Sequence, residues 1–179
     1  MCQKIISVSF WVFFPLILFP QATNSLQDNF IEAEYFFMSG DYQDALPLYL
    51  ELYEKNPDNS NIAYRIGACY LNITGKKNLA VDYLEAAVKF LSASHKEGTI
   101  MQKEAPYDAL YDLGCAYLIN YQFEKAKDVF SRFESTLLEE DHENHAIVKQ
   151  HIRSCVTAGE LIKKPVSYIE ENLGILFND

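Results

Sequence analysis

The chain has 179 residues, of which 49% are hydrophobic and 22% charged. A chain of this length favours one domain with a substantial core, and its apolar fraction excludes a largely disordered protein. The formal net charge is −10, from 15 Lys and Arg against 25 Asp and Glu. Because so acidic a surface repels the phosphate backbone, a general nucleic-acid role is excluded.

The first 22 residues predict an export signal. Lys4 precedes an apolar run over residues 5–19, and Ala22 offers a small residue for cleavage. This is the layout of a signal peptide, and the run is shorter than the ~20 apolar residues of a membrane-spanning helix. An uncleaved anchor is the alternative. We therefore expect residues 1–22 to be a signal peptide and the protein to be exported.

One pattern then occurs three times, at about residues 27–59, 60–93 and 106–138. The third copy has Leu, Leu, Gly and Tyr at the W-x2-L-G-x2-Y spacing, with Leu for Trp, followed by A-x3-F. These residues are Leu110, Leu113, Gly114, Tyr117, Ala126 and Phe130. The pattern resembles the tetratricopeptide repeat (TPR), although Glu32 replaces the expected Leu in the first copy. The resemblance predicts an all-α fold, a TPR-like α-solenoid of three helix-turn-helix repeats.

The spacing of the copies indicates an insertion. Ala33 and Gly67 are 34 residues apart, the TPR period, whereas Gly67 and Gly114 are 47 apart. Most of the 13 extra residues lie near the SASHKEGTIMQKEAP stretch. Small residues at these three positions should let paired helices approach closely.

Two further segments follow the repeats. Apolar residues recur at helical spacing from Val148 to Ile162, which predicts a capping helix over 143–164. Residues 165–179 begin with Pro165 and a β-prone stretch. We expect them to form an extended tail rather than a fourth repeat.

The TPR resemblance implies that a partner binds in a concave groove lined by the first helix of each repeat. The expected groove residues are Phe30, Glu34, Phe37, Tyr64, Ala68, Leu71, Tyr111, Cys115 and Leu118. These positions are aromatic, aliphatic or acidic, and Arg65 is the basic residue nearby. We therefore expect an apolar or basic protein or peptide partner, rather than an acidic one. The alternative is that the terminal helix or a neighbouring domain fills the groove.

Catalytic candidates are weak. His142, His145 and His151 lie close in sequence, and a metal-dependent hydrolase built on them is a remote alternative. The DHENH stretch does not match H-E-x-x-H, however. We expect no enzyme, no catalytic residue, no metal and no cofactor.

The cysteines of the exported part favour a structural role. Cys69, Cys115 and Cys155 do not form a C-x-x-C motif. Buried small residues are the favoured interpretation. A bridge between Cys69 and Cys115 is the alternative.

The end of the chain carries a second resemblance. Cys155, Ala158, Glu160-Leu161, residues 164–166 and residues 171–174 are similar to the region that follows the array in periplasmic OmpA-type proteins of Bacteroidetes. In that family a β-propeller and an OmpA-like domain follow. The resemblance implies a periplasmic scaffold and allows an association with the outer membrane. The alternative is a truncated N-terminal module whose groove serves its own missing domains.

Overall fold

The computed structural model describes residues 25–164 and 166–167. The expected signal peptide and residues 168–179 of the expected tail lie outside this part. The described residues form α-helices, one short 3-10 helix and one isolated β-bridge, without a β-strand. The helices are α1 (Ser25–Ser39), α2 (Tyr42–Lys55), α3 (Ser60–Asn72), η1 (Lys77–Leu79), α4 (Ala80–Ala87), α5 (Asp108–Ile119), α6 (Phe123–Glu134) and α7 (His142–Leu161). The expected all-α solenoid is confirmed, and no helix in this part of the chain is long and apolar enough to cross a membrane.

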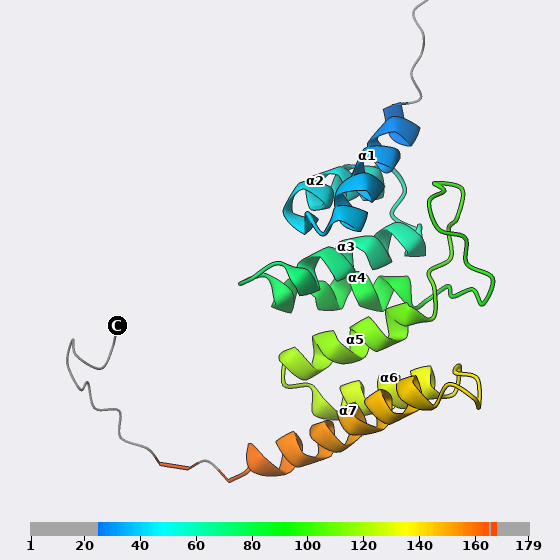
Figure 1. Ribbon diagram of the computed structural model, residues 1–179. Coiled ribbons are helices and arrows are strands. Elements are labelled where there is room, and N and C mark those ends of the chain that lie inside the picture. Colours follow the sequence, from blue (N-terminus) through cyan, green and yellow to red (C-terminus); the bar gives the residue numbers. More distant parts are fainter. Residues whose placement is uncertain (1–24, 165, 168–179) are drawn as a thin grey trace, which may run out of the picture.

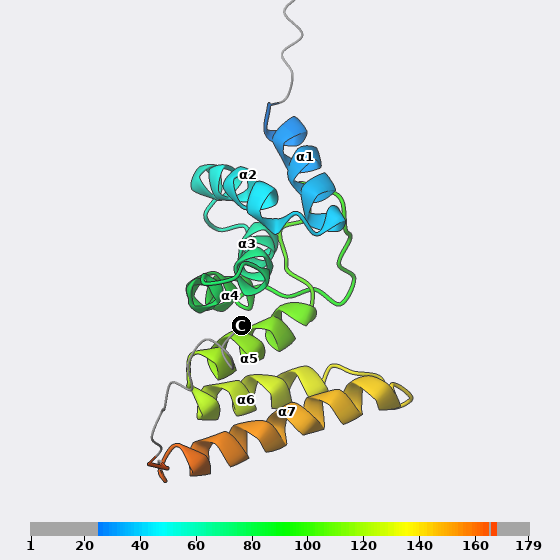
Figure 2. The same cartoon turned by 60° about the vertical axis from the view of Figure 1, so that its left-hand side comes forward.

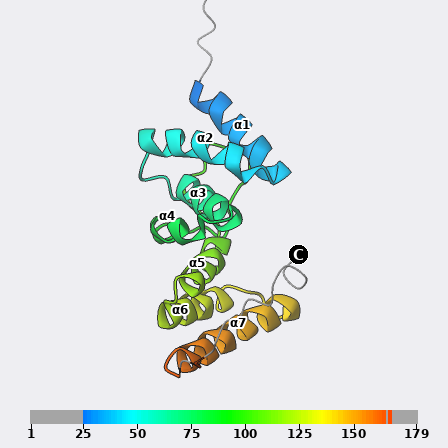
Figure 3. The ribbon, with the colours of Figure 1, turned by 90° about the vertical axis from the view of Figure 1, so that its left-hand side faces the viewer.

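The helices stack as antiparallel pairs into a column (Figures 1 and 3). Within the column, α1 packs on α2, α3 on α4 and α5 on α6, and α7 packs on α6. Contacts also join alternate helices, since Arg65 of α3 reaches Glu34 of α1 and the Tyr111 hydroxyl of α5 lies 3.0 Å from His151 of α7. The odd-numbered helices therefore lie side by side and form one layer of the solenoid, and we call their outer surface the odd-helix face.

Local sequence signals set the helix ends. Gly40 has a φ of 82° between α1 and α2, a left-handed conformation that glycine adopts without a steric penalty. Helix α2 ends at Lys55, two residues before Pro57, because a proline disfavours helical backbone in the residue that precedes it. The Asn59 side chain then accepts the Ile62 backbone N–H at 3.0 Å and caps α3.

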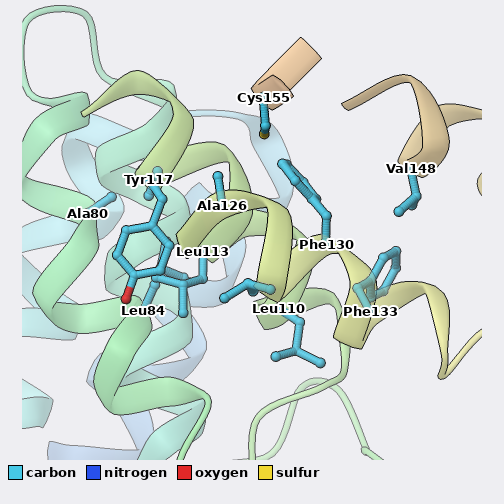
Figure 4. Packing of buried hydrophobic residues seen from close by; sticks show 12 residues of the cluster. Ala80, Leu84, Leu110, Leu113, Tyr117, Ala126, Phe130, Phe133, Val148 and Cys155 are labelled. Atoms are coloured by element: carbon cyan, nitrogen blue, oxygen red, sulfur yellow. The ribbon is translucent and has the colours of Figure 1, made fainter. Parts of the chain in front are cut away.

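Close helix approach within each repeat depends on small residues. A Cβ at Gly67 would lie 2.4 Å from Leu84, and a Cβ at Gly114 would lie 2.6 Å from the Phe130 ring. The second and third repeats and α7 share a buried cluster (Figure 4), in which Cys155 and Val148 of α7 lie against α6. A second cluster, around Phe30, Tyr49 and Ile66, joins α1, α2 and α3.

The insertion forms a long loop between α4 and α5 that runs past α3 toward α1 (Figures 1 and 2). Its two ends meet at the bridge between Leu91 and Ala105. Farther along, the Asn61 backbone N–H of α3 donates to the Lys103 carbonyl at 2.9 Å, and Ile100 packs against the cluster that contains Phe30. The insertion is therefore part of the packed structure of the first two repeats.

The three described cysteines are free thiols. The alternative of a Cys69–Cys115 bridge is therefore wrong. Cys69 and Cys155 are buried, and Cys115 is half-buried. Burial raises the pKa of Cys69 and of Cys115 to about 12, so both thiols stay protonated and poorly nucleophilic at neutral pH.

Candidate partner-binding face

Seven of the nine expected groove residues are half-buried, and they lie along α1, α3 and α5: Glu34, Phe37, Tyr64, Leu71, Tyr111, Cys115 and Leu118. The other two are corrections. Phe30 is 1% exposed and packs edge-on against Tyr49 at 6.5 Å between ring centroids, so it belongs to the core. Ala68 is 5% exposed and likewise offers no surface to a partner. The expectation that they line a groove is wrong, because neighbouring elements cover them.

An ion pair occupies the face between α1 and α3. The Arg65 Nε lies 3.0 Å from Glu34 Oε1, and its Nη2 donates to Oε2 at 3.2 Å. The Tyr49 hydroxyl of α2 donates to Glu34 at 2.6 Å, and the guanidinium lies 4.6 Å above the Phe37 ring. Because Arg65 is only 4% exposed and engaged on both sides, it is not available to an acidic ligand.

Uncompensated negative charge lies around Tyr64, between α3 and α5. Burial raises the pKa of the Tyr64 hydroxyl, and the carboxylates of Asp112, Asp108 and Glu97 raise it further, while Arg65 lowers it. None of these three carboxylates makes an ion pair with a cationic side chain of residues 25–164. Burial, with a smaller effect of Asp108, raises the pKa of Asp112 to about 7. This part of the face can therefore accept a cation.

The α5–α7 side of the face is closed by aromatic contacts. The Tyr111 ring lies 5.7 Å from Phe130 and 5.5 Å from Phe133, and His151 stacks on Phe130 at 5.0 Å. Burial lowers the pKa of His151, so its imidazole is neutral at pH 7. Tyr111 is thus held against α7, and the terminal helix covers part of the expected groove.

The α1 side of the face is open and apolar. Ile31, Tyr35 and Met38 follow one another at helical spacing and are 55%, 68% and 72% exposed. With Glu97 and Gly98 of the inserted loop they border a cavity of about 370 Å³. Exposed apolar surface beside a cavity is typical of a protein-binding site.

The three histidines do not form a metal site. His142 is exposed, His145 lies between Glu134 and the Leu138 carbonyl, and His151 contacts Tyr111. Within the part of the chain that the structure describes, no group of three or more His, Cys, Asp or Glu side chains is placed to hold a metal ion. The remote hydrolase alternative has no assembled centre there.

Sequence reasoning missed Asp112. Its position next to Tyr111 on α5 marks it as near the expected face, but its burial and raised pKa follow from the tertiary structure. The sequence alone carries a weak signal, since Asp108 and Asp112 are four residues apart and share one side of a helix without a basic neighbour.

No family model matches the sequence, and no curated protein matches it. Solved structures do match the fold. The crystal structure of the Sgt2 TPR domain from Aspergillus fumigatus is 16% identical, with a TM-score of 0.52 over 86% of this chain and 94% of that one. A crystal structure of MamA protein is 17% identical, with a TM-score of 0.33 over 82% of this chain and 99% of that one. The first likeness shows that this chain has the fold of a TPR domain.

Proposed function

We propose that this protein is an exported, non-catalytic scaffold whose odd-helix face binds an apolar or basic segment of a partner protein. The supporting observation is the charge arrangement around Tyr64. The carboxylates of Glu97, Asp108 and Asp112 each raise the pKa of its hydroxyl, and Arg65, the cation that lowers it, is already paired with Glu34. An acidic segment would meet repulsion there, whereas a Lys or Arg would find carboxylates without a partner.

The apolar part of the segment has a place beside this acidic region. Ile31, Tyr35 and Met38 present exposed side chains on α1, next to the loop that carries Glu97. A segment lying across α1 and α5 would bury apolar side chains at one end and neutralise carboxylates at the other.

Calorimetry with two matched peptides tests the proposal. A peptide of Leu and Lys should bind, and its counterpart with Glu for Lys should not. Replacing both Asp108 and Asp112 by Asn should weaken the first complex about tenfold, or ~1.4 kcal/mol. The control is Asp82→Asn with Asp128→Asn, which makes the same charge change at exposed positions of α4 and α6. Equal binding of both peptides, or equal loss in both double variants, contradicts the proposal.

Export and periplasmic location are part of the same proposal and rest on residues 1–22. Cleavage near Ala22 should leave a mature chain that begins before α1. N-terminal sequencing of the protein recovered from the periplasm checks this, and a sequence starting at Met1 would contradict it.

A further inference from the structure

A second candidate site lies far from Tyr64, at the end of the solenoid. A cavity of about 500 Å³ separates the start of α6 from the last turns of α7. Its apolar lining comes from Tyr121 and Phe123 on one side and from Val156, Gly159 and Ile162 on the other. Tyr121, Val156 and Ile162 are 73%, 51% and 57% exposed. The cavity is therefore open to an apolar occupant.

Tyr121 has an unfavourable backbone conformation at the edge of this cavity. Its φ is 58°, in the left-handed region that a bulky side chain rarely adopts. Gly40 and Gly75 occupy the same place in the first two repeats, five residues before the small residue of the second helix, and have φ values of 82° and 77°. The third repeat thus has an exposed aromatic residue at a position where glycine would adopt the left-handed backbone without strain. Such an outlier points to a function for the ring itself.

Within the residues that the structure describes, helix α7 lacks the partner that the other odd-numbered helices have. Each of α1, α3 and α5 pairs with the helix that follows it, whereas α7 packs on α6 and is followed by no further helix in the described part of the chain. Val156, Leu161 and Ile162 consequently remain exposed on its last turns. An apolar segment seated there would cover these exposed side chains.

We propose that residues 168–179 of the same chain dock in the cavity between α6 and α7. Residue 168 is five residues beyond Lys163, which itself borders the cavity, and an extended chain covers up to ~17 Å over that distance. Half of the segment is apolar or aromatic: Tyr168, Ile169, Leu173, Ile175, Leu176 and Phe177. Its length and position therefore allow it to reach Tyr121 from the end of α7.

The charged residues that border the cavity are compatible with residues 168–179 as its occupant. Residues 168–179 contain Glu170, Glu171 and Asp179 and no Lys or Arg. The cavity is bordered by Lys125, Lys127 and Lys163, against Glu124 and Glu160. Lys163 lies 3.1 Å from Glu160, Lys127 lies 4.0 Å from Glu124, and Lys125 lies 3.7 Å from Glu85, so these lysines are already paired. The cavity therefore lacks the excess of carboxylates found around Tyr64 and does not repel an acidic segment.

Photo-crosslinking tests the proposal in the purified protein. A Tyr121→p-benzoylphenylalanine variant should crosslink within one chain to residues 168–179, as read by mass spectrometry. Val156→Asp with Ile162→Asp should reduce this product about tenfold, an effect of ~1.4 kcal/mol if docking is a two-state equilibrium. Leu138→Asp, at an exposed apolar residue outside the cavity, should leave it unchanged. Absence of the product, its persistence in the double variant, or crosslinks between two chains would overturn the proposal.

Tyr121→Gly gives a second readout that does not depend on the crosslinker. The variant should melt at a higher temperature than the wild type, because glycine relieves the left-handed backbone. At the same time, amide exchange of residues 168–179 should become several-fold faster. Higher stability with unchanged exchange would show that the ring does not hold the segment, and would overturn the proposal.

Discussion

The effect of replacing a helical glycine by alanine on stability depends on the atoms that surround it, as Gly114 and Gly159 show. A Cβ at Gly114 would lie 2.6 Å from the Phe130 ring, which is buried and cannot move away. A Cβ at Gly159 would lie 3.9 Å from Phe123, an ordinary contact. The same substitution should therefore have opposite effects at the two positions.

Gly114→Ala should lower the free energy of unfolding by ~1–3 kcal/mol, because overpacking at a helix contact forces the ring and backbone apart. The larger Gly114→Leu should cost at least as much. Gly159→Ala should raise the free energy of unfolding by ~0.5–1 kcal/mol, because alanine is the better helix former. Chemical denaturation of the variants checks this. An unchanged midpoint for Gly114→Ala would show that α5 and α6 are not in the described contact.

Asp112 should make the protein less stable as the pH rises, which is the opposite of the usual effect of a carboxyl group. Its pKa rises from 3.8 to about 7 on folding, so the folded state binds the proton more tightly than the unfolded state. The contribution of Asp112 to the free energy of unfolding is therefore fully present below about pH 4 and is lost as the pH rises to about 7. Asp112→Asn should be more stable than the wild type at pH 8 by ~1–3 kcal/mol, given ~1.4 kcal/mol per pKa unit and partial solvent access. Thermal melts at pH 4 and pH 8 test this, and an equal difference at both would contradict it.

At the scale of elements, the ion pair between Arg65 and Glu34 joins three helices. Arg65 belongs to α3, Glu34 to α1, and the Tyr49 hydroxyl that donates to Glu34 belongs to α2. The two charged side chains are 4% and 12% exposed. Removal of one charge would leave the other buried without a partner, which is costlier than removal of both.

Arg65→Met should therefore lower the free energy of unfolding by ~3–5 kcal/mol, and the double variant with Glu34→Gln should recover much of that loss. Lys55→Met serves as the control, because it breaks the exposed pair with Glu51 and should cost less than ~1 kcal/mol. Denaturation of the wild type, Arg65→Met, Glu34→Gln, the double variant and the Lys55→Met control supplies the comparison. Strict additivity of the Arg65 and Glu34 changes would show that the two side chains are not coupled.

At the scale of the whole molecule, the described residues form three buried clusters, and Tyr70 packs against the two larger ones. The terminal helices α1 and α7 each pack mainly on one neighbour, whereas the inner helices contact two or more. In such an array stability comes from nearest-neighbour contacts, so the ends open first.

Amide exchange should follow this order. Amides of α3, α5 and α6 should exchange most slowly, and those of α1 and α7 faster. Residues 168–179 should be faster still, even when docked, because we expect an extended tail rather than a further helix of the array. Mass spectrometry of timed samples checks the order. Protection of that segment equal to α5 would show that it folds as a further repeat.

Much of the fold is local in origin and could be predicted from the sequence. Gly67 and Gly114 stand where helices of one repeat touch, and Leu84 and Phe130 fill the space opposite them. The two partners of each contact belong to the same repeat and lie 17 and 16 positions apart, so the periodic pattern reveals them. The resemblance of residues near the end of the chain to envelope proteins stays a prediction, and part of it lies outside the described residues.

The accessibility of the predicted face is a tertiary property. Phe30 occupies the same repeat position as Tyr64 and Tyr111, yet it is buried within a cluster against which Ile100 of the inserted loop packs. The pairing of Arg65 with Glu34 likewise joins residues 31 positions apart. The sequence by itself determined the repeat, its helices and their small contact residues, because these depend on neighbours within one helical pair. Only the tertiary structure decided which side chains a partner can reach and which charges lack a counterion, because burial and pairing depend on contacts between repeats.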